Sequence, residues 1–235
     1  MTRCDEPAVY SQGGEQRALL AHFERHGVGR GCLLDVGAND GRSYSNSLAL
    51  IERGWGGLLV EPHPGAADAC RRRHAANPRV RVCSAGATAG DDPALATLHV
   101  CEGGTATPGD APLVHTTVAS ERDRWGSARW SAVEVALWPI SYLLRLASCH
   151  AEGVDTPGRV ACVTIDAEGV SGALARRLAR QLSEEDALQP VAAIVIEKDG
   201  SASREDLELL FWRFGFVVAL ETPENVVLTR GASHG

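Results

Sequence analysis

The stretch LLDVGANDG, from Leu33 to Gly41, decides the fold of this 235-residue chain. A short apolar run ends in an acid and breaks into a turn with two glycines. Beyond the turn, Leu48 and Ile51 repeat with helical spacing. This order predicts a strand, a tight turn and a helix. In an open α/β sheet such a turn lies at the carboxyl edge of the strands, where ligands bind, although an ordinary βα turn can also carry two glycines.

The pattern on either side of this stretch alternates between strands and helices. Before Asn77-Pro78 it predicts an amphipathic helix over 15–26, a strand over 32–36, a helix over 45–53, a strand over 57–60 and a helix over 65–76. A further strand follows over 80–84. This βαβαβ order is one half of a doubly wound fold.

The second half of the chain continues the alternation. Strands are predicted over 133–137, 160–165, 191–196, 216–220 and 226–229, and a capping box at Ser203 starts a helix with Leu207, Leu210, Phe211 and Phe214 on one face. The last two strands are joined by so few residues that they must run antiparallel. We therefore predict an α/β fold: a seven-stranded, mostly parallel Rossmann-like sheet with a terminal antiparallel hairpin and helices on both faces.

We expect one domain over 1–235, with a helical cover over 1–30 and an irregular insertion on the substrate side over 85–132. The net charge of −7 lacks the footprint of a nucleic-acid-binding protein. There is no apolar run long enough to span a bilayer, and the seven cysteines show no C-x-x-C spacing. We therefore expect a cytoplasmic protein with no nucleic-acid or membrane partner. No pattern indicates an oligomeric state.

Four predicted parallel strands each deliver an acid at their carboxyl end: Asp35, Glu61, Asp166 and Glu197. Because parallel strands share a direction, these acids should gather along one rim of the sheet, beside the glycine turn. Each acid taken singly could instead cap the following helix. The clustering favours a ligand site at this rim.

The spacing of Glu61 favours a nucleoside ligand. Glu61 follows Gly37 by 24 residues, close to the spacing at which a Rossmann unit places the acid that holds a ribose hydroxyl. The NAD fingerprint is absent, because Asn39 and Arg42 occupy its second and third glycine positions. A cationic ligand without phosphates suits the acidic rim better, and S-adenosylmethionine is such a ligand. Asp35 could help to hold its amino acid part.

Two strings, LLDVGANDGRSYSNSLALIERGWGGLLVEPHP (Leu33 to Pro64) and VTIDAEGV (Val163 to Val170), resemble the FkbM family of S-adenosylmethionine-dependent methyltransferases. The resemblance implies a class I methyltransferase fold and O-methylation of a sugar or secondary metabolite. It also implies that the cofactor is bound by the turn residues and Glu61, with the SNS motif nearby: Gly37, Asn39, Gly41, Ser45 and Asn46. The chain departs from the family pattern at Glu15-Gln16 and at Glu197-Lys198-Asp199.

Methyl transfer to an alcohol needs a base or a Lewis acid. Asp166, Glu168 and Glu197 could hold a cation such as Mg²⁺; alternatively Asp166 or His63 could act as the base, with Glu168 beside it. His63 could equally line the adenosine side, and Gln12 could reach the site if the N-terminal helix covers the rim. The acceptor should be a small molecule with a hydroxyl group. The rival readings are an NAD-dependent Rossmann oxidoreductase and a non-catalytic nucleoside-binding protein.

Overall fold

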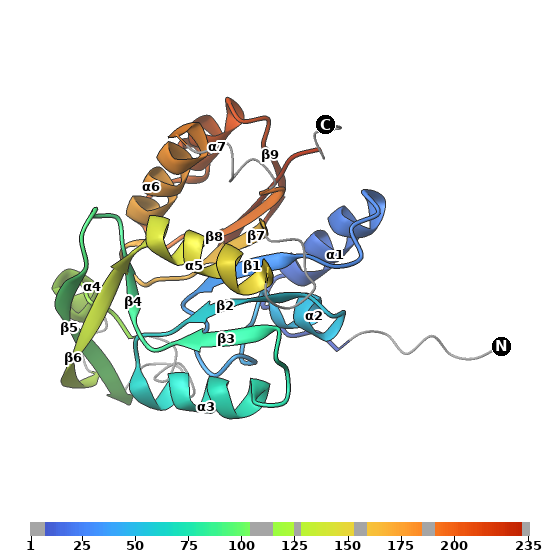
Figure 1. Cartoon of the computed structure of the whole chain (residues 1–235). Helices are drawn as coiled ribbons and strands as arrows, with labels where there is room; N and C mark the ends of the chain where they lie inside the picture. Colours follow the sequence, from blue (N-terminus) through green and yellow to red (C-terminus); the bar gives the residue numbers. More distant parts are fainter. Residues whose placement is uncertain (1–7, 104–114, 125–127, 153–158, 185–190, 232–235) are drawn as a thin grey trace.

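The computed structural model of the chain describes residues 8–103, 115–124, 128–152, 159–184 and 191–231 (Figure 1). Its main sheet has seven strands in the order β3-β2-β1-β7-β8-β10-β9. In chain order these are β1 (Cys32–Val36), β2 (Gly56–Val60), β3 (Val80–Cys83), β7 (Val160–Ile165), β8 (Ala193–Glu197), β9 (Val217–Glu221) and β10 (Asn225–Thr229). Only β10 runs antiparallel to its neighbours. The predicted fold class is confirmed.

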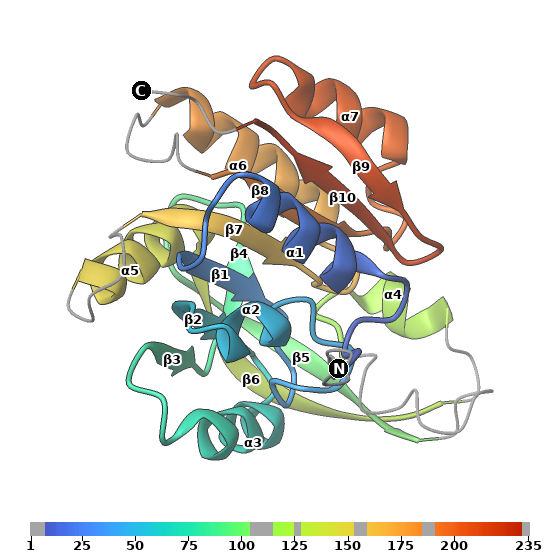
Figure 2. The ribbon, with the colours of Figure 1, turned by 90° about the vertical axis from the view of Figure 1, so that its right-hand side faces the viewer.

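Helices cover both faces of this sheet (Figures 1 and 2). On one face pack α5 (Ile140–Glu152), α6 (Ser171–Glu184) and α7 (Arg204–Trp212); on the other lie α1 (Glu15–Arg25), α2 (Leu48–Glu52) and α3 (Pro64–His74). Every residue of β1 is buried, and successive side chains enter opposite layers, with Leu34 in the first core and Leu33 in the second. The site loops that follow β1 are thus anchored in a strand buried on both sides.

The predicted helices exist, with shifted ends. The helix expected from Ser45 begins at Leu48. The Ser45 hydroxyl accepts hydrogen bonds from the backbone N–H groups of Ser47 and Leu48, and so closes a turn that precedes the helix. The predicted capping box of α7 is confirmed, with Ser203 and Asp206 exchanging side-chain-to-backbone hydrogen bonds of 3.1 Å.

The insertion predicted to be irregular is more regular than the sequence suggests, within the residues that the structure describes. It forms a second, three-stranded sheet in the order β4-β6-β5, from β4 (Gly86–Thr88), β5 (Ala94–Gly103) and β6 (Arg129–Pro139). The strand expected over 133–137 is therefore part of β6. A short helix, α4 (Ala119–Arg124), follows a bridge between His99 and Thr116. The small core of this sheet is formed by Leu98, Val100 and Val135, with Val133 and Leu137 packed against them.

None of the described helices is both long enough and apolar enough to cross a membrane.

Candidate active site

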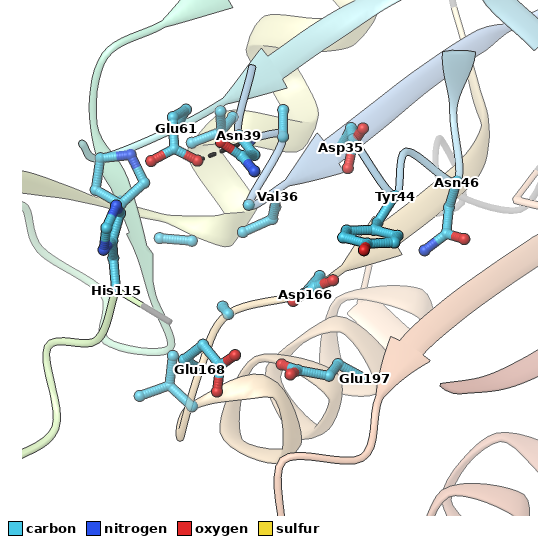
Figure 3. Close-up of a pocket in the computed structure, with 18 of the residues that line it drawn as sticks. Asp35, Val36, Asn39, Tyr44, Asn46, Glu61, His115, Asp166, Glu168 and Glu197 are labelled. Atoms are coloured by element: carbon cyan, nitrogen blue, oxygen red, sulfur yellow. Dashed lines mark hydrogen bonds between the residues drawn. The ribbon is translucent and has the colours of Figure 1, made fainter. Parts of the chain in front are cut away.

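A cavity of about 440 Å³ opens at the carboxyl ends of the parallel strands (Figure 3). The loop after β1, the ends of β2, β7 and β8, and the second sheet all contribute to its wall. The four acids expected at the rim, Asp35, Glu61, Asp166 and Glu197, all line it. The prediction that parallel strands bring them together is confirmed, and the volume is in the range of small-molecule sites.

Gly37 is needed at the floor of this cavity. Its φ is +86°, and a Cβ built there would lie 1.7 Å from the backbone oxygen of Asp166. Its N–H and that of Ala38 donate to the carbonyl of Val60 at 2.9 and 3.1 Å. The turn therefore runs tightly between β2 and the end of β7, where a side chain would not fit.

Gly41, which the family resemblance places in the cofactor turn, packs against α3. It is not among the residues that line the cavity, and a Cβ there would lie 2.8 Å from Cys70 Sγ and 2.9 Å from His74 Nε2. The glycine therefore allows the turn to pack against α3. Asn39, by contrast, lines the cavity with a positive φ of 50°.

Glu61 is held in place by the backbone. Its two carboxylate oxygens accept the N–H groups of Asn39 at 2.8 Å and His63 at 2.7 Å. Burial raises the pKa of Glu61 to about 7. A carboxylate has about four acceptor positions, so two remain for a ligand that donates hydrogen bonds, such as a diol.

Asp35 is buried beneath the cavity, and the Ser47 and Thr164 hydroxyls donate to it. Burial raises the pKa of Asp35. These two hydrogen bonds tie the end of β1 to Ser47 before α2 and to Thr164 in β7. Ser45 and Asn46 also line the cavity; the Ser45 hydroxyl is engaged in the turn, whereas Asn46 Oδ1 is buried with no hydrogen-bond partner among the described residues.

Asp166 and Glu197 form a hydrogen-bonded carboxyl pair at the ends of β7 and β8. Burial and the charge of Asp166 raise the pKa of Glu197 strongly, so that Glu197 keeps a proton at neutral pH and donates it to the Asp166 carboxylate. Ser171 also donates to Glu197 at 3.3 Å. Asp166 is thus the oriented, ionised member of the pair.

The expected metal site is not supported. Asp166, Glu168 and Glu197 line the same cavity, but no cluster of three His, Cys, Asp or Glu side chains in the described part of the chain has an arrangement that would hold a metal ion.

His63 lies outside the cavity lining. Its Nδ1 caps α3 by accepting the N–H of Ala66 at 3.3 Å, and its ring packs on His115 with centroids 4.6 Å apart. His115 and Tyr44 also line the cavity. From the sequence His115 could be a substrate contact or an exposed residue, and Tyr44 had no predicted role. The backbone signal at Tyr44, a φ of +56°, appears only in the structure.

The N-terminal segment reaches the site, as considered for Gln12, which lines the cavity. The segment is fixed by Glu15, a fully buried carboxylate at the start of α1. Glu15 accepts hydrogen bonds from Gly13 N at 2.8 Å, Thr222 Oγ1 at 3.0 Å and Asn225 Nδ2 at 2.9 Å. The turn between β9 and β10 thus anchors the chain that passes over the rim.

Comparison with known proteins gives one family and several similar structures. The model of the methyltransferase FkbM domain matches residues 35–170. No curated protein matches the chain. Sp1610 of Streptococcus pneumoniae, a candidate tRNA methyltransferase, is 17% identical over 88% of this chain and 68% of its own, with a TM-score of 0.40. ChlM of Synechocystis PCC 6803, a magnesium protoporphyrin IX methyltransferase solved with bound S-adenosylmethionine, is 10% identical over 93% of this chain and 80% of its own, with a TM-score of 0.43.

Proposed function

The chain belongs to the FkbM family of S-adenosylmethionine-dependent methyltransferases, and we propose that it methylates a hydroxyl oxygen of a small molecule such as a sugar or another secondary metabolite. The observation that carries the proposal is the Asp166–Glu197 pair. It puts an ionised, oriented carboxylate into the same cavity as Glu61, the candidate ribose ligand.

Glu61 and the turn from Gly37 to Asn39 would hold the nucleoside. The ribose hydroxyls donate to the acceptor positions that Glu61 keeps free, and Gly37 allows the backbone to come close. Asp35 and Asp166 make the adjoining wall negative. S-adenosylmethionine suits this wall because its sulfonium is a cation, and when bound it supplies the methyl group and leaves as a neutral thioether.

Asp166 would act as the general base. The acceptor hydroxyl donates its hydrogen bond to Asp166 and gives up its proton to that carboxylate as the oxygen–carbon bond forms and the carbon–sulfur bond breaks. The proton on Glu197 keeps Asp166 oriented and prevents repulsion between two adjacent carboxylates. Holding the oxygen in line with the methyl carbon is the other contribution of the cavity wall. In the proposed step the Asp166 carboxylate takes the proton, so the step does not depend on a metal ion.

A small neutral or cationic acceptor fits the charges of the cavity. Its lining includes six acidic residues, of which Glu197 is protonated, and no Lys or Arg among the described residues: Asp35, Glu61, Asp166, Glu168, Glu197 and Glu224. With a net charge of −7, such a surface would repel a phosphate backbone. Two features disfavour an oxidoreductase that binds NAD. The acidic cavity would repel the pyrophosphate of NAD, and Asn39 takes the position of the second fingerprint glycine.

The test is a panel of sugar, polyketide and phenolic hydroxyl compounds incubated with a radiolabelled methyl donor. For the acceptor found, Asp166→Asn should lower kcat by about 10²- to 10⁴-fold, the usual contribution of a general base. The affinity for S-adenosylhomocysteine, measured by calorimetry, should change little. Asp68→Asn, which only breaks an exposed ion pair with Arg71 on α3, is the matched control. Full turnover by Asp166→Asn would refute the assignment of the base.

A further inference from the structure

His115 is fixed at the cavity wall by the second sheet. Its Nδ1 accepts the backbone N–H of Cys101 at 3.3 Å. The next residue, Thr116, exchanges two backbone hydrogen bonds with His99, of 2.8 and 3.1 Å. The Thr116 hydroxyl also donates to the carbonyl of Glu168 at 2.8 Å, which ties this edge to the loop after β7. The imidazole therefore has little freedom to move.

These contacts set the tautomer of the ring. Because Nδ1 accepts a backbone hydrogen bond, the proton of the neutral imidazole is on Nε2. Burial, with a smaller contribution from His63, lowers the pKa of His115 to about 4, so the ring is neutral in solution near pH 7. The hydrogen bonds between the described residues engage Nδ1 of this ring and not Nε2. Among the described residues, the wall thus presents Nε2–H as a neutral donor that is left for a ligand.

His115 lies at the end of the cavity away from the carboxyl pair. Figure 3 shows it on the side of Glu61, with Glu197 on the opposite side. The surrounding lining is mainly apolar, and comes from the end of β2 and from the second sheet: Pro62, Ala87, Leu98 and Leu137. If Glu61 holds the ribose and Asp166 faces the methyl group, this end is left for the base. A flat aromatic ring with few polar atoms suits such a slot.

We propose that His115 Nε2–H donates a hydrogen bond to a ring nitrogen of the adenine, so that the second sheet supplies the polar recognition of the cofactor base. The inference rests on the proposed function, since it takes the ribose to be held at Glu61. It assigns to the insertion a part in cofactor binding, where the sequence suggests a role on the substrate side alone.

The experiment measures binding of S-adenosylhomocysteine by calorimetry to the full chain and to three variants. His115→Phe keeps a ring against His63 and removes the donor, whereas His115→Gln restores an N–H near the Nε2 position. His26→Phe, at the end of α1 and outside the cavity lining, is the control. We expect His115→Phe to bind about threefold to tenfold more weakly, the range for one neutral hydrogen bond. His115→Gln should regain part of the loss, and His26→Phe should bind like the unmodified chain.

Analogues in which one adenine ring nitrogen is replaced by CH identify the partner atom. Removing the nitrogen that accepts from His115 should weaken binding to the unmodified chain and have no further effect on His115→Phe. The proposal would be overturned if every analogue weakened binding to His115→Phe as much as it weakens binding to the unmodified chain. Unchanged binding of S-adenosylhomocysteine by His115→Phe would also overturn it. If the unmodified chain binds no S-adenosylhomocysteine at all, the proposed function itself fails. Melting curves identify a variant that is unfolded, and the analogue comparison on His115→Gln then decides.

Discussion

Gly37→Ala is the substitution whose effect follows most directly from the structure. At φ +86° an L-residue costs about 1–2 kcal/mol relative to glycine. The new Cβ would in addition lie 1.7 Å from the carbonyl oxygen of Asp166, whereas ordinary contact begins at 3.4 Å. Because the obstacle is backbone, no side-chain rotation relieves the overlap. The turn must move away from β7, which breaks the hydrogen bond of 2.9 Å from Asp166 N to Val36 O and costs about 1 kcal/mol more.

The free energy of unfolding should therefore fall by about 3 kcal/mol or more, measured by urea denaturation followed by circular dichroism. Binding of S-adenosylhomocysteine should be lost with it, since the same movement displaces the floor of the cavity and Asp166. Gly215→Ala is a matched control, because φ there is +79° and nothing lies within 4 Å of the added Cβ. That control should lose only the conformational part, about 1–2 kcal/mol. Equal losses for the two variants, with cofactor binding intact in Gly37→Ala, would refute the reasoning.

Three further predictions concern other parts of the site. Burial raises the pKa of Glu61 from 4.5 to about 7, so the protonated side chain stabilises the fold in acid, and this contribution to the free energy of unfolding should be lost as the pH rises through about 7. The affinity for the cofactor, measured by calorimetry, should rise with pH between 4.5 and about 7 as Glu61 ionises. Glu61→Gln should remove both dependences, and Glu61→Ala should abolish binding. Glu15→Ala leaves the Thr222 hydroxyl and the Asn225 amide without their buried acceptor, and should lower the free energy of unfolding by about 1–3 kcal/mol. Burial opposes ionisation of Glu15, but its hydrogen bonds hold its pKa below 4.5. The difference in free energy of unfolding between the unmodified chain and Glu15→Ala should therefore shrink in acid, as the pH falls through that lowered pKa. A chelator should leave the rate of methyl transfer unchanged; a rate restored only by an added divalent ion would contradict the assigned role of the carboxyl pair.

The fold could be predicted from the sequence because its central strands are buried on both sides. Continuous apolar runs such as those ending at Asp35 and Glu197 fix the parallel strands, and their shared direction fixes the rim on which the acids meet. The short connection from β9 to β10 predicts the one reversed strand correctly. These features depend only on neighbours in sequence or on a rule of topology.

The second sheet and the roles of single residues depend on contacts that sequence spacing does not encode. β5 and β6 mix buried, half-buried and exposed positions, so burial does not alternate regularly along the whole length of either strand. His63 looked like a candidate base because it follows Glu61, yet its ring caps a helix. The sequence left His115 as a substrate contact or an exposed residue, and its tautomer could not be predicted, because it is set by the backbone N–H of Cys101 in β5.

In the part of the insertion that the structure describes, the separate core of the second sheet contains three buried apolar side chains, whereas the main sheet is packed between two large layers. Regions with few buried contacts open at a lower free energy than the rest of a domain. On gentle heating this outer wall should therefore open first, while the seven-stranded sheet is still folded. Such inactivation would be reversible on cooling, and would appear as faster amide hydrogen exchange in β5 and β6 at temperatures where the overall circular dichroism spectrum is unchanged.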